Sequence, residues 1–154
     1  MGTLNAKSNR NHRSADMDMY DPSGFVYKVP EDAEVGFDYP DDLGHGQLLN
    51  VRMSYQEQPW RYVDFAFNHY LAEHHELNRT GEEIDVARID CCENSIHRHQ
   101  FFRSQREQEK HFYHQFSEQT CTEDCIELIN DMYDKCYREM VEDYRQHYTD
   151  WRDK

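Results

Sequence analysis

Apolar and polar residues alternate strictly over residues 49–56, and this pattern limits the local structure more than any other feature of the chain. The apolar positions are Leu49, Val51, Met53 and Tyr55. Because successive side chains of a strand point to opposite faces, the alternation predicts a strand with one buried face. Further runs rich in β-branched and aromatic residues cover residues 60–67, 84–90, 96–103 and 111–116. Short polar turns separate most of these runs, which favours an antiparallel meander of four or five strands.

The C-terminal part of the chain predicts one long amphipathic helix. Its apolar and aromatic residues recur at spacings of three and four: Ile126, Ile129, Tyr133, Cys136 or Tyr137, Met140, Tyr144 and Tyr148. This period places them on one face, which can cover one side of the sheet. Thr120 and Glu123 have the spacing of a capping box, which marks the start of a helix. The sequence therefore predicts an α+β fold, in which one long C-terminal helix covers an antiparallel meander.

The first part of the chain has a different character. Residues 1–23 are polar and lack a periodic apolar pattern, so we expect a disordered tail. A single α+β domain then covers residues 24–154. Residues 25–29 have the composition of a short strand that ends before Pro30. Residues 31–46 are acidic and rich in turn-forming residues, and they are predicted to be connecting turns.

The net charge of −14 narrows the class of function. A nucleic-acid footprint over the whole surface needs basic residues, so this charge argues against one and favours solubility, a basic partner or life in high salt. Aromatic residues are abundant, with 11 Tyr and 8 Phe, and they predict a core built on rings. The chain shows neither a signal-peptide pattern nor an apolar run of the roughly 18 residues that span a bilayer. We therefore expect a cytoplasmic protein without a membrane partner.

Polar residues of catalytic type stand two apart on two neighbouring predicted strands. Arg88 and Asp90 share one face of the first strand, and His97 and His99 share one face of the second. If the strands pair as a hairpin, a guanidinium, a carboxylate and two imidazoles converge on one patch. Imidazole titrates near neutrality, so the histidine pair is suited to acid–base chemistry. The alternative is that both histidines belong to the solvated face of the sheet, where Arg88 and Asp90 form ordinary ion pairs.

Cysteine usage predicts neither a disulfide framework nor a metal centre. Five cysteines are an odd number, and a chain expected in the cytoplasm keeps its thiols reduced. Cys91 and Cys92 lie close in sequence to His97 and His99, and together they offer thiolate and imidazole donors. Adjacent cysteines, however, do not have the spacing of structural zinc sites. We therefore expect no cofactor and no metal ion, and zinc ligation by these four residues is the alternative.

The pattern Ala87-Arg88-Ile89-Asp90, followed by a turn and by His97, Arg98 and His99, resembles small prokaryotic proteins of the TumE type. The resemblance covers roughly residues 46–151 and includes the order of strands and the closing helix. Residues 39–42 and 87–90 are also similar to uncharacterised small proteins of salt-loving archaea. Proteins of the TumE type look like the toxin half of a toxin–antitoxin pair. The resemblance therefore implies a small toxin-like protein of a toxin–antitoxin or defence type that acts as a metal-independent ribonuclease.

The toxin interpretation assigns a role to each residue of the patch. His97 and His99 exchange protons with RNA, Arg88 or Arg98 stabilises the phosphorane, and Asp90 orients a histidine. An antitoxin is then the expected protein partner, and RNA is the substrate. The alternative function is a non-catalytic interaction module whose acidic surface binds a basic protein.

Overall fold

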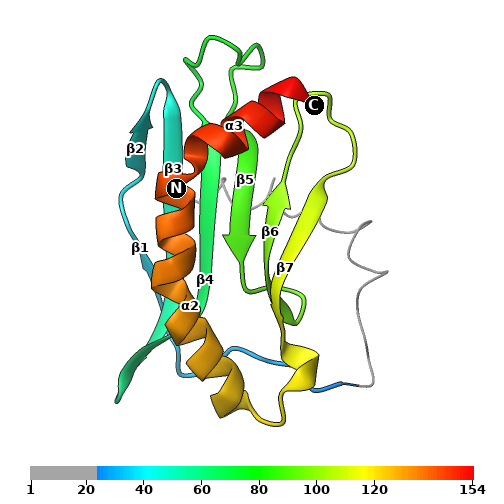
Figure 1. Cartoon of the computed structure of the whole chain (residues 1–154). Coiled ribbons are helices and arrows are strands. Elements are labelled where there is room, and N and C mark those ends of the chain that lie inside the picture. The colour runs from blue at the N-terminus through cyan, green and yellow to red at the C-terminus, as the bar shows by residue number, and fades with distance from the viewer. Residues whose placement is uncertain (1–23) are drawn as a thin grey trace.

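Residues 24–154 are described by a computed structural model, in which two helices pack on one face of an antiparallel β-sheet (Figure 1). The strands are β1 (Glu34–Phe37), β2 (Asp41–Gly44), β3 (Gln47–Glu57), β4 (Trp60–Leu71), β5 (Ile84–Asp90), β6 (Ser95–Gln100) and β7 (Glu109–Gln115). After them come the 3-10 turn η1 (Phe116–Glu118) and the helices α2 (Thr122–Glu142) and α3 (Tyr144–Asp153). The predicted α+β class is confirmed. The predicted disordered tail, residues 1–23, lies outside the described residues.

The predicted meander is confirmed from β3 to β7, where each strand pairs antiparallel with the next. Over residues 24–154 the sheet has seven strands, more than the four or five expected, because β1 and β2 both pair with β3. Both lie in the segment that was predicted to form turns. Each has only four residues, too few to produce a clear alternating pattern, and the long strand β3 provides their partner.

Residues 25–29, predicted as a short strand, run beside the β5–β6 turn without joining the sheet. The side chain of Asn94 in that turn replaces a strand partner. Its Oδ1 accepts from Tyr27 N at 2.7 Å, and its Nδ2 donates to the Phe25 carbonyl at 2.6 Å. The Tyr27 hydroxyl also donates to the carbonyl of Val63 at 2.6 Å. Side-chain hydrogen bonds therefore satisfy backbone groups that a strand ladder would otherwise satisfy.

Alternation in the central strands separates an apolar face from a polar one. Phe67 pairs with Ile89, and the ring of Tyr133 from α2 packs on Phe67, so the helices cover this face. The next positions along the strands, Asn68 and Arg88, pair with each other and point to the opposite face. The polar row continues into β6 because Arg88 also stands opposite a histidine of that strand. Register alone therefore places the candidate site on the face of the sheet away from α2 and α3.

The C-terminal helix is broken, in contrast to the single long helix predicted. The first helix ends at Glu142, and Asp143 leaves helical geometry, with φ −101° and ψ 10°, before α3 begins. The break allows α3 to cross β5 and β6, where Gln100 Nε2 donates to the His147 carbonyl at 3.1 Å. Two helices that run in different directions therefore cover the sheet, where the sequence predicted a single helix (Figure 1).

The start of α2 also differs from the prediction. The N-cap is Cys121, which makes no side-chain capping hydrogen bond, and the Thr120 hydroxyl donates to Asp124 Oδ2 at 3.2 Å. The predicted capping box is therefore absent. The amphipathic face is confirmed, because Tyr133 is buried and lies flat on Tyr62 with ring centroids 3.5 Å apart.

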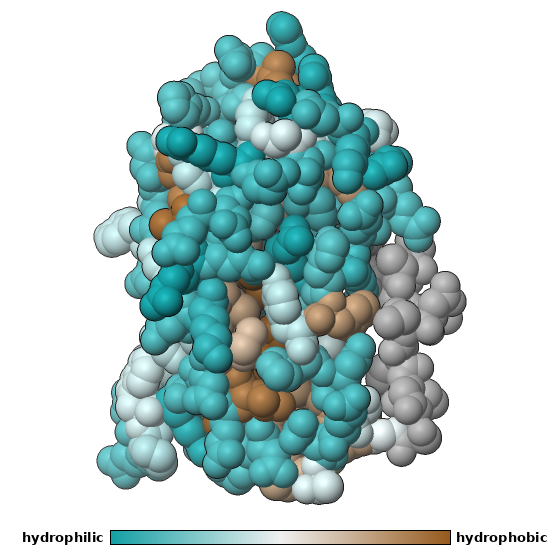
Figure 2. Space-filling model, viewed as in Figure 1, coloured by the Kyte–Doolittle hydropathy of each residue, from teal (hydrophilic) through white to brown (hydrophobic). Residues whose placement is uncertain are grey.

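The surface is largely polar over the helix-bearing side. Figure 2 shows this side as mostly hydrophilic, with hydrophobic residues visible in a hollow beside α2.

Trp60, at the start of β4, is 53% exposed. All five cysteines are free thiols. Among the described residues, no helix combines the length and the apolar character that crossing a bilayer requires.

Candidate functional site

Four of the five predicted site residues lie together on the face of the sheet away from the helices. In the β5–β6 ladder, Asp90 stands opposite His97, and Arg88 stands opposite His99. Arg98 does not join them, because alternation turns it to the helix-bearing face. There its Nη1 donates to the side-chain oxygen of a glutamine in the same strand at 3.1 Å. Arg98 therefore does not contribute to this cluster.

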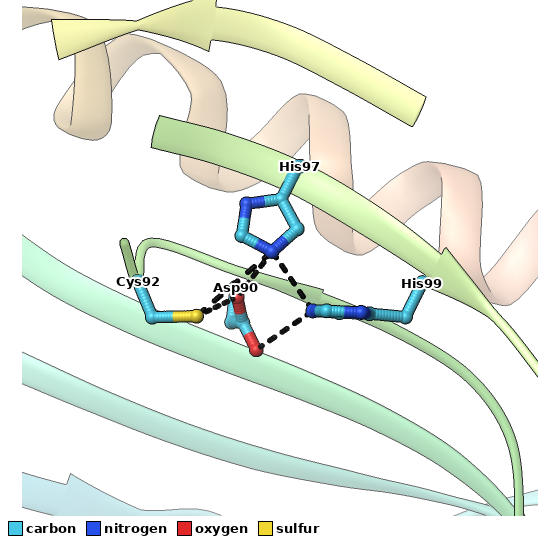
Figure 3. A group of neighbouring side chains, drawn as sticks. All are labelled: Asp90, Cys92, His97 and His99. Atoms are coloured by element: carbon cyan, nitrogen blue, oxygen red, sulfur yellow. Dashed lines mark hydrogen bonds and ion pairs between the residues drawn. The ribbon is translucent and has the colours of Figure 1, made fainter. Parts of the chain in front are cut away.

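The ring nitrogens of the two histidines meet at the centre of the site (Figure 3). His97 Nε2 lies 2.8 Å from His99 Nε2. The Asp90 carboxylate lies beside both rings, with Oδ1 3.4 Å from His97 Nε2 and Oδ2 3.8 Å from His99 Nε2. Arg88 Nε is 3.0 Å from Asp90 Oδ2, so a guanidinium also pairs with this carboxylate.

Cys92 adds a sulfur atom to the group. It lies in the β5–β6 turn, which contains two consecutive non-glycine residues with positive φ and so reverses the chain sharply. Its neighbour Cys91 is buried in the core, whereas Cys92 Sγ donates to Asp90 Oδ1 at 2.8 Å and lies 3.9 Å from His97 Nε2. Each of four side chains thus offers a donor atom within 4.8 Å of the other three: Asp90, Cys92, His97 and His99. We call these four residues the Asp–Cys–His cluster.

The outer nitrogens of both rings bind oxygen atoms, and this orients the inner nitrogens. His97 Nδ1 lies 2.8 Å from Ser95 Oγ, and that hydroxyl donates to the Cys92 carbonyl at 3.4 Å. His99 Nδ1 lies 2.7 Å from Gln108 Oε1. An amide oxygen can only accept, and a hydroxyl that already donates accepts in its turn, so both rings donate from Nδ1. In the neutral tautomer that carries its proton on Nδ1, each ring therefore directs an Nε2 lone pair into the cluster.

Burial works against a proton on His97 and outweighs the attraction of the neighbouring carboxylate. Burial has the largest influence on His97 and lowers its pKa, the attraction of Asp90 opposes this, and the repulsion of Arg88 adds to it. Burial alone would raise the pKa of Asp90, but His97, Arg88 and His99 together lower it. Burial and the adjacent Asp90 raise the pKa of the Cys92 thiol. Near neutral pH the cluster therefore contains a carboxylate, a thiol and a neutral His97 ring.

Three of the four cluster residues are closed to solvent. Asp90 is 5% exposed and both imidazole side chains are 0% exposed, while Cys92 is only partly buried. The alternative that His97 and His99 form part of a solvated sheet face is therefore wrong. Buried polar groups are costly unless they are paired, so three of them gathered at one point require a specific partner or a specific role.

Comparisons with protein-family models, with curated proteins and with solved structures find no match for this chain. The chemistry of the site is therefore inferred from its geometry.

The pattern of residues on each side of the turn indicates what the sequence interpretation missed. Asp90 and Cys92 repeat, before the turn, the spacing of two that His97 and His99 show after it. This symmetry predicts a four-donor group, whereas the adjacent cysteines drew attention to Cys91.

Proposed function

We propose that this chain binds a divalent transition-metal ion, zinc in the first instance, through the Asp–Cys–His cluster. The observation that carries the proposal is the 2.8 Å separation of two Nε2 atoms that each present a lone pair. Two lone pairs at this distance repel one another unless a cation, either a proton or a metal ion, lies between them. Burial disfavours the proton on His97 and so favours a metal ion that both rings can bind.

The spacing of the donor atoms supports a tetrahedral site. Around zinc, with bonds of about 2.0–2.3 Å, the donor atoms lie about 3.3–3.6 Å apart. Four of the separations in the cluster run from 2.8 to 3.9 Å. Outward shifts of about half an ångström therefore accommodate the ion. Ser95 and Gln108, which bind the outer ring nitrogens, act as the supporting partners that zinc-bound histidines usually have.

Charge balance also favours a metal ion. A thiol that coordinates a metal loses its proton, even where burial has raised its pKa. The Cys92 thiolate and the Asp90 carboxylate then bring two negative charges, which balance a divalent cation. Arg88 remains on Asp90 Oδ2 and holds the carboxylate in place. Four protein ligands leave no open position, which is typical of a metal that stabilises a fold. Here the ion ties β5 to β6.

The sequence led us to expect no metal ion, so a metal ion at this position differs from that prediction. That expectation rested on the poor chelating geometry of the adjacent pair Cys91 and Cys92. The structure separates the two thiols, with one in the core and the other beside Asp90. Asp90 takes the place of Cys91 in the donor set, and the objection based on adjacent cysteines no longer applies.

Elemental analysis of the purified full chain tests the proposal. We expect about one zinc ion per chain, and we expect His97→Ala and Cys92→Ser each to lose most of it. Cys121→Ser is the matched control, because Cys121 is exposed and lies outside the cluster. A chelator should lower the melting temperature of the wild type and leave that of Cys92→Ser unchanged. A chain that takes up no zinc, or a Cys92→Ser variant that retains it, contradicts the proposal.

A second function, RNA cleavage by a toxin-like protein, is favoured by the Arg88–Asp90 contact beside the two imidazoles. In that case His97 and His99 share a proton, and Arg88 offers positive charge to a phosphorane. Growth inhibition on expression, together with RNA cleavage in EDTA, distinguishes the two functions. Cleavage that survives EDTA and falls about 10²–10⁴-fold in His97→Ala favours the ribonuclease. Stoichiometric zinc without cleavage or growth inhibition favours the metal centre.

A further inference from the structure

A pocket of about 510 Å³ lies where α3, the β2–β3 turn and the β4–β5 loop meet. Its volume is within the range of small-molecule sites. The pocket is at the opposite end of β5 from the Asp–Cys–His cluster, because β5 begins after the β4–β5 loop and ends at Asp90. Figure 1 shows α3 crossing the sheet at this end. The pocket and the cluster share no residue, so the two sites can be tested separately.

One face of α3 provides positive charge to the pocket. The lining residues of this face are spaced by three and four: Arg145, Tyr148, Thr149 and Arg152. Arg152 Nε is paired with Asp153 Oδ1 at 2.7 Å. Arg145 has no acidic partner within residues 24–154, and its Nε donates to the Tyr144 hydroxyl at 3.2 Å. The single acidic residue among the described lining residues is Glu76. Because Arg145 has no acidic partner within residues 24–154, its guanidinium is the one most available to an anionic ligand.

His75 presents a hydrogen-bond donor to the pocket. The residue is 6% exposed, and its Nδ1 accepts the Leu77 N–H at 3.0 Å. A neutral imidazole that accepts at Nδ1 carries its proton at Nε2. That Nε2–H has no hydrogen-bond partner in the described part of the chain and is accessible from the pocket that His75 lines, so a ligand oxygen can accept from it. Gly46, with φ +73°, allows the ring to pack close, since a Cβ there would lie 3.2 Å from its Cδ2.

Aromatic rings form another wall of the pocket, which Tyr144 and Tyr148 both line. The Tyr148 ring lies edge-on to His75 at a centroid distance of 5.5 Å and stacks on Trp151 at 5.9 Å. Trp151 is itself 2% exposed and belongs to the core. Because its neighbours hold the Tyr148 ring from two sides, a planar ligand meets an aromatic surface that is already ordered.

We propose that this pocket binds a mononucleotide. Arg145, Arg152 and the His75 Nε2–H bind the phosphate, and the base packs on Tyr144 or Tyr148. Guanidinium groups match the geometry of phosphate oxygens, and charged hydrogen bonds of this kind are among the strongest in proteins. A mononucleotide suits this pocket better than an apolar ligand does, because the pocket offers two guanidinium groups, a donor without a partner among the described residues, and aromatic walls.

Calorimetric titration of the full chain with AMP and UMP tests the proposal, with adenosine and inorganic phosphate as separate probes. We expect both nucleotides to bind at least about tenfold more tightly than adenosine or phosphate. Arg145→Gln should weaken binding by about tenfold or more. Arg138→Gln is the matched control, because Arg138 is exposed on α2 and makes the same change of charge outside the pocket. It should bind the nucleotides as the wild type does.

A variant of His75 tests the donor itself. His75→Asn keeps an acceptor near Leu77 N but lacks the Nε2–H, so we expect weaker nucleotide binding. The melting temperature, measured alongside, reports the packing that the smaller side chain loses. Three results overturn the proposal: no binding of either nucleotide, phosphate alone bound as tightly as AMP, or Arg145→Gln equal to Arg138→Gln. Each of these three results can occur whether or not the Asp–Cys–His cluster holds zinc, so the two proposals can fail separately.

Discussion

Asn94 connects the turn that carries Cys92 to two distant segments. Its side chain binds the backbone of Phe25 and Tyr27, and its carbonyl accepts from Phe116 N at 2.8 Å. Its own backbone has φ 60°, a conformation that Asn tolerates better than most residues. The position of Cys92 therefore depends on contacts outside the β5–β6 hairpin as well as within it.

We expect Asn94→Ala to lower the free energy of unfolding by about 2–4 kcal/mol, because two hydrogen bonds disappear and Ala disfavours positive φ. Asn94→Gly should cost less, because glycine accepts this φ although it also lacks the hydrogen bonds. Urea denaturation measures both losses. Equal losses would show that backbone strain contributes nothing. An Asn94→Ala variant as stable as the wild type would contradict the role assigned to this side chain.

The residues of the cluster differ in how far the sequence could predict them. Arg88, Asp90, His97 and His99 follow from the period of two on strands joined by a short turn. Cys92 keeps the same spacing of two from Asp90, but it lies in the turn beyond the end of β5, where the period of a strand no longer fixes which way a side chain points. Burial could not be predicted either, since polar residues on a strand usually face water.

At the scale of single elements, α2 offers a direct test of helical phase. Met140 is 0% exposed, whereas Glu142 is exposed on the same helix. We expect Met140→Ala to lower the free energy of unfolding by about 2–5 kcal/mol, because it leaves a cavity between the helix and the sheet. Glu142→Ala should cost less than about 0.5 kcal/mol. Thermal and urea denaturation of the pair provide the comparison, and similar losses would mean that the packed face is misassigned.

The elements that the sequence predicted well are those with many residues of one period. The strand β3 has 11 residues and α2 has 21, and both were recognised from their patterns. The strands β1 and β2 were missed because four residues carry little periodic information. The break at Asp143 was missed because the apolar spacing continues across it to Tyr144 and Tyr148. The break lets α3 contact β5 and β6, and such contacts between distant segments cannot be read from local preference.

At the scale of the whole molecule, buried histidines make stability depend on pH. Burial is the main reason that the pKa of His69 falls to about 3 and that of His147 to about 4. Repulsion from His147 also lowers the pKa of His69, and repulsion from Arg98 also lowers the pKa of His147. In the unfolded chain both titrate near 6.5. Below that pH the unfolded state binds more protons than the folded state. The free energy of unfolding should therefore fall as the pH drops from about 6.5 toward 4, by up to about 1.4 kcal/mol per pH unit for each proton.

A variant isolates one of these histidines. His147→Leu removes one titrating group, so its free energy of unfolding should fall less steeply than that of the wild type between about pH 6.5 and 4.5. His74→Leu is the control, because His74 is exposed and is not among the groups that shift the pKa of His147, so it should leave the slope unchanged. Urea denaturation at several pH values measures the slopes. A His147→Leu slope equal to that of the wild type would show that His147 is not held neutral by the fold.

The two tryptophans give this chain a pair of optical probes in opposite surroundings. Trp60 is 53% exposed at one end of the sheet, and Trp151 is 2% exposed behind Tyr148. Iodide in solution therefore quenches the red-shifted emission of Trp60 and leaves the blue-shifted emission of Trp151. The fluorescence that remains reports on α3 alone, so occupancy of the neighbouring pocket can be followed in the native chain without attaching a dye.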